Sequence, residues 1–231
     1  MTCVAFDIDG TIYDCGDIVV DAFQEGARRF GELHGAGIAT PSREEILRHV
    51  GIPTDEIFVN LYPMLGAAAQ LELNDLSMES LSAMVRGGGG ILYEGVRETI
   101  EGLFRGGRRI LAASNGKLPY IQAILETYGL MEFFEGPLVV VGKELKDKSD
   151  IVRHYLDSRC NDELLIMVGD RESDVRAAKV NGVPFIGCAF GHAGTEEMKG
   201  ERWIVQDFSD IPDVVKAIEG MDLQGRGRKN V

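Results

Sequence analysis

The sequence has little cysteine, and its cysteines are scattered. Cys3, Cys15, Cys160 and Cys188 make no CxxC pair, and no histidine stands near them at the spacing of metal ligands. A zinc site or a dense disulfide framework needs such clustering, so the spacing argues against both. We expect four reduced thiols in a reducing compartment.

Long apolar runs and positive charge are also scarce. No run approaches the roughly 18 apolar residues of a membrane-spanning helix, and the first residues lack the basic and apolar regions of a secretion signal. The formal net charge is −13, whereas nucleic acids and anionic membranes bind basic surfaces. We therefore expect a cytoplasmic protein that binds neither nucleic acid nor membrane.

What is present is the composition of a globular protein. The 231 residues are 45% hydrophobic and 26% charged, and they contain no internal repeat. This length suffices for one large domain, or for a core with an inserted subdomain.

The most informative stretch is Val4-Ala5-Phe6-Asp7-Ile8-Asp9-Gly10-Thr11. Its apolar residues are typical of a buried strand. Asp7 and Asp9 place two carboxylates at the end of that strand, where buried charge is costly unless a cation neutralises it. Mg²⁺ takes oxygen ligands and joins carboxylates to phosphate oxygens. Thr11 adds a hydroxyl and a backbone N–H that can donate hydrogen bonds to an anion.

Residues 15–90 predict helices and no strand. Apolar residues recur there at three- and four-residue steps, as on one face of a helix, and Ser42 with Glu45 forms a capping-box pattern. The expected helices are Asp17–His34, one beginning at Ser42, one beginning at Pro53, and Ser77–Arg86.

From Ile91 onward, strands and helices alternate, which predicts a parallel sheet covered on both faces. The expected strands are Arg109–Ala113, Leu138–Val141, Leu164–Val168, Pro184–Cys188 and Trp203–Val205. The expected helices are Glu94–Arg105, Lys117–Tyr128, Ser149–Asp157, Ser173–Asn181 and Ser209–Glu219. We expect a discontinuous α/β core of residues 1–14 and 91–220, a helical cap of residues 15–90, and a flexible tail of residues 221–231.

Ligands of such sheets bind at the carboxyl ends of the strands. Polar residues stand at several of these strand ends. One pair, Ser114 and Asn115, leads into a helix, and the start of a helix can bind an anion. The polar residues are Asp7, Asp9, Ser114, Asn115, Asp170 and Asp174.

In this order, the motifs resemble those of the haloacid-dehalogenase-like superfamily of phosphatases and phosphotransferases. The matching residues are Asp7-Ile8-Asp9-Gly10-Thr11, Ser114-Asn115, Lys148 and Gly169-Asp170-x-x-x-Asp174. The resemblance implies an α/β Rossmannoid core and a smaller all-helical cap of type C1, inserted between the first and second motifs. Such a cap closes over the site and sets substrate choice. Asp14–Gly16 and Gly87–Gly90 are the expected hinges.

The resemblance also implies roles for these residues. Asp7 would be the nucleophile that forms an aspartyl-phosphate, and Asp9 the general acid and base. Phosphate would be bound by Thr11, Ser114, Asn115 and Lys148. Mg²⁺ would be held by Asp7, by Asp9 through its backbone carbonyl, and by Asp170, with Asp174 or Glu172 supporting these ligands.

Some positions keep alternatives. Lys148 precedes Ser-Asp-Ile-Val rather than the prolines found in many members, and Lys146 is its alternative. The alternative role of Ser114 is a helix cap, and that of Asp174 is a first-turn residue favoured by the helix dipole.

Cys15 and the histidines carry weaker predictions. Cys15 is expected to be a small packed side chain, with sensitivity to oxidation as its alternative. His192 follows a strand, and a position facing the site is its alternative to a surface role. The remaining histidines, expected on the surface or in packing, are His34, His49 and His154.

Asp9 decides between reactions within the superfamily. Members that dehalogenate lack this second aspartate, because a halide leaving group needs no proton. Tyr93–Val96 and Gly182–Pro184 look most like phosphoglycolate-phosphatase-type enzymes. We expect a Mg²⁺-dependent phosphatase of a small phosphorylated metabolite, either a monomer or a homodimer. The alternatives are a β-phosphoglucomutase-like transferase, whose cap motif has no clear counterpart here, and a non-catalytic relative that binds phosphate or a partner.

Overall fold

The computed structural model describes residues 1–35, 37–49, 52–161, 163–192 and 196–229. Their contacts divide the chain into two compact units. The α/β unit consists of residues 1–14, 92–114 and 132–231, and the helical unit of residues 15–91 and 115–131. The expected fold class, a mostly parallel sheet with helices together with a helical part, is confirmed.

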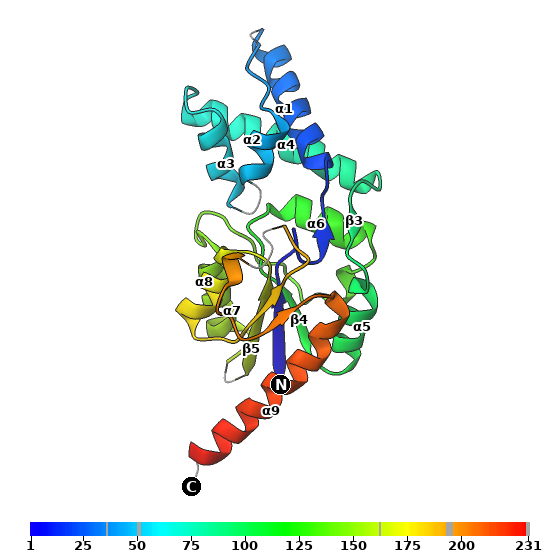
Figure 1. Ribbon diagram of the computed structural model, residues 1–231. Helices are drawn as coiled ribbons and strands as arrows, with labels where there is room; N and C mark the ends of the chain where they lie inside the picture. Colours follow the sequence, from blue (N-terminus) through cyan, green and yellow to red (C-terminus); the bar gives the residue numbers. More distant parts are fainter. Residues whose placement is uncertain (36, 50–51, 162, 193–195, 230–231) are drawn as a thin grey trace. The chain divides into compact units, whose positions relative to one another are not determined.

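The α/β unit is organised around a five-stranded parallel sheet in the order β4-β1-β5-β6-β7. Figure 1 shows β1 (Thr2–Phe6) beside β4 (Arg109–Ala112) and β5 (Leu164–Gly169). The outer strands are β6 (Phe185–Cys188) and β7 (Ile204–Val205). Because β1 is paired on both sides and covered on both faces, its residues from Cys3 to Phe6 are all apolar and buried rather than alternating.

Helices cover both faces of this sheet. On one face, α7 (Lys148–Ser158) and α8 (Glu172–Asn181) pack with Cys3 and Ala5 of β1 in a single buried cluster. Phe6 points to the opposite face, since successive strand residues alternate, and stacks on Phe208 with ring centroids 5.7 Å apart. The remaining helices of the unit are α5 (Val96–Arg105) and α9 (Ile211–Lys229).

The structure corrects two expected elements of the α/β unit. Leu138–Val141 was expected to be a strand, but only one isolated bridge forms there, between Ser114 and Val140. Val139 and Val141 instead pack partly buried against the core cluster, so the apolar run serves packing rather than sheet pairing. At the other end of the unit, α9 continues beyond Glu219 to Lys229. Glycine costs a helix only about 1 kcal/mol, and Gly220 is accommodated within it.

The helical unit contains α1 (Ile18–His34), α2 (Arg43–His49), α3 (Thr54–Leu61), α4 (Ala67–Arg86) and α6 (Leu118–Thr127). α1 packs along α4, and a Cβ on Gly26 would lie 2.0 Å from Ser77 Oγ, so the close approach requires glycine. The capping box is confirmed: Ser42 N–H donates to Glu45 Oε2 at 2.8 Å, and Glu45 N–H donates to Ser42 Oγ at 3.3 Å. α4 begins at Ala67 rather than at Ser77, because a run of alanines extends it toward the N-terminus.

Residues 115–131 group with the helical unit, where α6 packs on α4. The sequence-based division assigns this segment to the core. Gly88 and Gly90, in one expected hinge, have φ of 86° and 69°, and Gly16, in the other, has φ of 51°. The domain boundaries and the hinges remain predictions. No helix among the described residues has both the length and the apolarity needed to cross a membrane.

The cysteines are arranged differently from the expectation of four thiols. Cys3 and Cys160 form a disulfide, although 157 positions separate them in the sequence. Cys15 and Cys188 are buried thiols, as expected. The expectation failed for the first pair because local spacing carries no information about contacts between residues so far apart.

Candidate active site

Three carboxylates converge at the carboxyl edge of the sheet. Asp7 follows β1, Asp170 follows β5, and Asp174 lies in the first turn of α8. The pairing of β1 with β5 sets their proximity, since Phe6 lies opposite Val168 and Asp7 N–H donates to Val168 O at 2.9 Å. One oxygen from each carboxylate lies within 4.8 Å of the others, and all three residues are buried.

Lys148 is the buried cation of this cluster. It is the first residue of α7, and Asp147 caps that helix by accepting from Ser149 N–H and Asp150 N–H. The Lys148 ammonium lies 2.8 Å from Asp7 Oδ2 and 2.7 Å from Asp174 Oδ1. Lys146, the sequence-based alternative, is exposed. The geometry therefore favours Lys148 over Lys146 as the lysine of the site.

One ammonium does not offset three buried carboxylates. Burial raises the pKa of Asp7 to about 6 and that of Asp174 to about 6, although Lys148 acts in the opposite direction on both. Burial and the Asp174 charge also raise the pKa of Asp170. Burial opposes the charge of Lys148, but Asp174 and Asp7 raise its pKa above the usual value. The site is thus electrostatically short of positive charge at neutral pH.

The donor set fits a hard divalent cation. The three groups that could surround such an ion here are all carboxylates, and carboxylate oxygens are ligands that Mg²⁺ prefers. A bound cation would also lower the electrostatic cost of the three carboxylates, whose pKa values are raised in its absence. Asp7, Asp170 and Asp174 are therefore the residues that could hold a metal ion.

Glycines allow the backbone to enclose these carboxylates, and sequence reasoning found only part of this arrangement. Gly10 has φ of 80°, and a Cβ on it would lie 2.4 Å from Asp170 Oδ2. A Cβ on Gly191 would lie 2.4 Å from Asp170 Cβ and 2.3 Å from Gly10 O. Gly169 is confined in the same way by Asp174, whose Cγ would lie 2.2 Å away. Gly191 was missed because nothing local in the sequence indicates a close approach to Asp170.

The other predicted residues differ in burial and in the unit to which they belong. Thr11 is fully buried, and its hydroxyl is 3.5 Å from Asp170 Oδ1. Asp9 is partly buried, and its backbone forms an isolated β-bridge with Tyr13. Ser114 is buried at the end of β4, the strand beside β1. Asn115 is buried and begins the second segment of the helical unit. The catalytic and binding roles of these residues remain predictions.

His192 reaches the cluster through its backbone. Its N–H donates to Asp170 Oδ2 at 2.8 Å, while its ring Nε2 lies 3.3 Å from Asp14 Oδ1. The backbone N–H of Arg171 also binds the cluster, since it donates to Asp174 Oδ2 at 3.0 Å. The N–H of Glu172 donates outside the cluster, to Glu197 Oε2, and Glu172 is exposed. Asp174 and Glu172 were the two residues expected to support the metal ligands, and of these Asp174 lies in the cluster.

The other histidines lie outside the cluster. His34 Nε2 is 3.0 Å from Glu72 in the helical unit, and His49 Nδ1 is 2.7 Å from the carbonyl of Glu45. His154 lies against the ring of Tyr155, with centroids 6.1 Å apart. These contacts agree with the expected surface and packing roles.

Carboxylates that can hold a divalent ion, placed with a buried ammonium at the carboxyl edge of a parallel sheet, are typical of enzymes that process phosphate groups. Residues 4–188 match the family model described as haloacid dehalogenase-like hydrolase. The chain belongs to this family.

Known proteins resemble the chain over most of its length. A 5'-nucleotidase of Pseudomonas aeruginosa is 24% identical over 205 residues, which cover 86% of this chain and 87% of that protein. A phosphoglycolate phosphatase of Vibrio parahaemolyticus is 26% identical over 228 residues, covering 92% and 95%. The crystal structure of a predicted phosphatase from Clostridium acetobutylicum aligns with a TM-score of 0.74 at 24% identity, covering 94% of this chain and 98% of that one. This last likeness shows a shared fold.

Proposed function

We propose that the chain is a Mg²⁺-dependent phosphatase that hydrolyses a small phosphomonoester through an aspartyl-phosphate on Asp7. The chain is a phosphoric monoester hydrolase of the haloacid dehalogenase-like family. The observation that carries the finer proposal is the convergence of Asp7, Asp170 and Asp174 around Lys148. Three carboxylates and one ammonium match the needs of a metal ion and a phosphoryl group together.

Asp7 is the proposed nucleophile. Its carboxylate attacks phosphorus and displaces the alcohol, which divides one difficult displacement into two easier ones. With a pKa near 6, Asp7 is ionised at neutral pH, as a nucleophile must be. Lys148, 2.8 Å from Asp7 Oδ2, is positioned to neutralise phosphoryl oxygens as charge moves onto them.

Asp9 follows Asp7 by two residues and is the proposed proton donor to the leaving alcohol. The same carboxylate then takes a proton from the water that hydrolyses the aspartyl-phosphate. Thr11, Ser114 and Asn115 are the proposed donors to the remaining phosphate oxygens. A bound Mg²⁺ would supply positive charge that offsets the developing negative charge on the phosphoryl group.

The relatives guide the choice of substrate. One is named a phosphoglycolate phosphatase and another a 5'-nucleotidase. Both names indicate a phosphomonoester substrate, but the alcohol released would differ. We propose a small phosphorylated metabolite of the 2-phosphoglycolate type as the substrate. The protein is proposed to act in the cytoplasm, as a monomer or homodimer, without nucleic acid or membrane partners.

The test is phosphate release from a panel of 2-phosphoglycolate, nucleoside 5'-monophosphates and sugar phosphates, with Mg²⁺ or with EDTA. We expect one preferred substrate, loss of release in EDTA, and a fall of roughly 10³-fold or more in Asp7→Asn. A phosphorylated peptide containing Asp7, found by mass spectrometry after rapid quenching, would support the intermediate. Full activity of Asp7→Asn would refute the proposal that Asp7 is the nucleophile. Trapping at Asp7 without phosphate release would instead favour the phosphotransferase, and the absence of both would favour the non-catalytic relative.

A further inference from the structure

The disulfide of Cys3 and Cys160 lies at the end of β1 opposite the candidate active site. Cys3 is the second residue of β1, and Cys160 follows α7, whose first residue is Lys148. Both cysteines are buried in the core cluster, at 0% and 1% exposure. The disulfide therefore links β1 to the segment just after α7, and the ion pair links Asp7, just after β1, to the first residue of α7.

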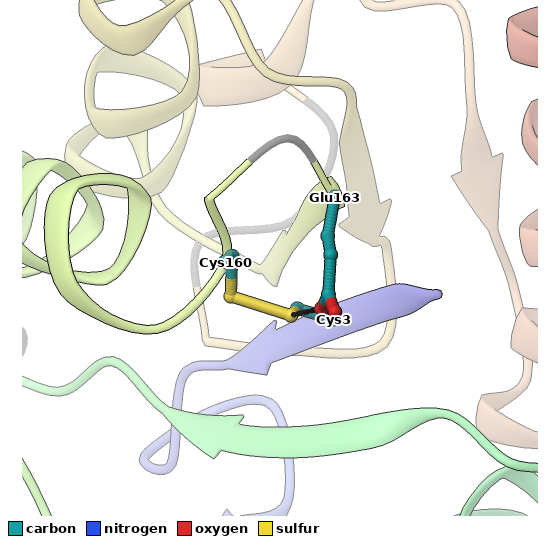
Figure 2. A group of neighbouring side chains, drawn as sticks. All are labelled: Cys3, Cys160 and Glu163. Atoms are coloured by element: carbon teal, nitrogen blue, oxygen red, sulfur yellow. Dashed lines mark hydrogen bonds between the residues drawn. A yellow bond between two sulfur atoms is a disulfide. The ribbon is translucent and has the colours of Figure 1, made fainter.

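Figure 2 shows the carboxylate of Glu163 beside the Cys3 sulfur. Glu163 Oε2 lies 3.2 Å from Cys3 Sγ, close enough to accept the S–H proton when the pair is reduced. Arg109 Nη1 lies 3.0 Å from the same oxygen and keeps positive charge next to it. The bond to Arg109 also fixes the carboxylate in place against Cys3. The two sulfurs and one carboxylate oxygen of Glu163 thus lie within 4.8 Å of one another.

Glu163 also connects this cluster to the surface. Together with Leu156, Leu164 and Leu165 it lines an open cavity of about 570 Å³. Leu165 is the partner of Cys3 in the pairing of β1 with β5. A small molecule in this cavity would therefore lie next to the residues that cover the two sulfurs.

We propose that Cys3 and Cys160 form a reversible redox site that exchanges with low-molecular-weight disulfides, with Glu163 as the base for Cys3. Because both cysteines are buried, exchange requires a local opening on the cavity side. We expect it to take minutes to hours, as for uncatalysed disulfide rearrangement. The site is separate from the carboxylate cluster and does not depend on the proposed phosphatase activity.

The exchange is balanced as two thiol–disulfide steps. Glu163 takes the proton of Cys3, and the Cys3 thiolate attacks one sulfur of the small disulfide. Its S–S bond breaks, and the released thiolate leaves as a thiol after taking the proton from Glu163. The Cys160 thiol, as its thiolate, then attacks the Cys3 sulfur and releases the second small thiol with the remaining proton. The protein dithiol loses two electrons and two protons, and the small disulfide gains both.

The oxidised pair should stabilise the fold without altering the reaction. A disulfide constrains the unfolded chain most when it closes a long loop, and this one joins residues 157 positions apart. At the opposite end, Lys148 keeps its own contacts with Asp7 and Asp174. We expect reduction to lower the melting temperature by roughly 10 °C and to change kcat by less than about twofold.

The first measurement is a thiol titration of the full-length protein in denaturant. After equilibration with oxidised glutathione we expect two reactive thiols, those of Cys15 and Cys188, and after reduction we expect four. Peptide mapping should find Cys3 joined to Cys160. Four thiols after oxidation, or a different pairing, would overturn the proposal. The melting temperature of oxidised wild type should also fall on reduction, whereas that of Cys160→Ala should be insensitive to reductant.

The second measurement isolates Glu163. We expect the reduced Glu163→Gln variant to form the disulfide roughly 10-fold or more slowly than wild type in oxidised glutathione. The matched control is Glu135→Gln, because Glu135 binds the other edge of the Arg109 guanidinium, through Nε and Nη2, at 2.7 Å. Equal rates in wild type and Glu163→Gln would exclude the base. Stable binding of Zn²⁺ by the reduced pair, with no disulfide formed in oxidised glutathione, would replace the redox site with a metal site. Neither thiol counts nor melting temperatures require turnover, so these results stand apart from the phosphatase test.

Discussion

Lys148 donates a hydrogen bond to Asp174 Oδ1 at 2.7 Å and forms an ion pair with Asp7 Oδ2 at 2.8 Å, with its side chain only 2% exposed. A single ammonium thus joins the end of β1 to the first turn of α8. Both carboxylates would be buried without a cation if this lysine were removed.

The first prediction concerns Lys148→Met. We expect kcat to fall by roughly 10²–10³-fold, because a positioned positive charge at the phosphoryl group is lost. The free energy of unfolding at pH 8 should fall by about 3–5 kcal/mol, since the partners of a broken buried ion pair remain charged. Kinetics and chemical denaturation measure the two effects. Lys146→Met is the control, because Lys146 is exposed and should leave both quantities unchanged. A large loss of kcat in Lys146→Met, with none in Lys148→Met, would make Lys146 the phosphate-binding lysine.

The second prediction concerns pH and the metal-free protein. The pKa of Asp7 is raised from 3.8 to about 6, and so is that of Asp174. Between these values the folded state binds protons that the unfolded chain has released, so the free energy of unfolding falls as pH rises. The stabilisation from protonation is complete below pH 4 and is lost as pH passes through 6.

Asp7→Asn removes one of these carboxylates and should therefore be more stable than wild type in EDTA. We expect its melting temperature to be higher by roughly 5 °C at pH 7.5 and the difference to vanish near pH 4.5. Differential scanning calorimetry at the two pH values measures this. A variant less stable than wild type at pH 7.5 would show that the contact with Lys148 outweighs the cost of burying Asp7.

The third prediction is that Mg²⁺ stabilises the protein. A ligand that binds only the folded state raises the melting temperature, by about 2.7 kcal/mol of stabilisation at 100 times its dissociation constant. The metal should also make the stability of wild type less dependent on pH between 4 and 7, since it favours the ionised carboxylates. Asp170→Asn should lose most of the Mg²⁺-induced shift, whereas Asp213→Asn, on the exposed surface of α9, should keep it. Equal shifts in all three proteins would place the metal elsewhere.

The fourth prediction concerns Gly191. A Cβ at this position would lie 2.4 Å from Asp170 Cβ, so Gly191→Ala must displace either the loop or the carboxylate. We expect activity to fall by roughly 10–100-fold and the Mg²⁺ concentration for half-maximal activity to rise. Gly142→Ala is the matched control, because no atom lies within 4 Å of a Cβ at Gly142. A normal Mg²⁺ dependence in Gly191→Ala would show that the loop moves without disturbing Asp170.

Patterns that are local in sequence predicted much of the fold. The apolar run of β1, the three- and four-residue steps of α1, and the box of Ser42 and Glu45 each carry their own signal within a few residues. Leu138–Val141 has an equally apolar run but no strand, because strand formation depends on a partner edge that the run itself does not specify.

The candidate site likewise has features that local sequence patterns predict and features that they do not. Asp7, Asp170 and Asp174 could be placed together, because parallel strands bring their carboxyl ends to one edge. The two contacts of Lys148 and the close packing of Gly191 on Asp170 depend on tertiary distances. So does the disulfide of Cys3 with Cys160, which joins elements 157 positions apart. No local pattern indicates such contacts.

The division of the chain at residues 15, 92, 115 and 132 has a consequence for how the protein could be recombined. A cap formed by one uninterrupted insertion could be exchanged between relatives as a single block. Here α6 lies outside residues 15–91 yet packs on α4. A chimaera that replaced only residues 15–91 would confront α6 with an unrelated helix, so a compatible exchange requires matched changes in residues 115–131. Divergence of the helical unit is thereby tied to the segment that directly follows Ser114.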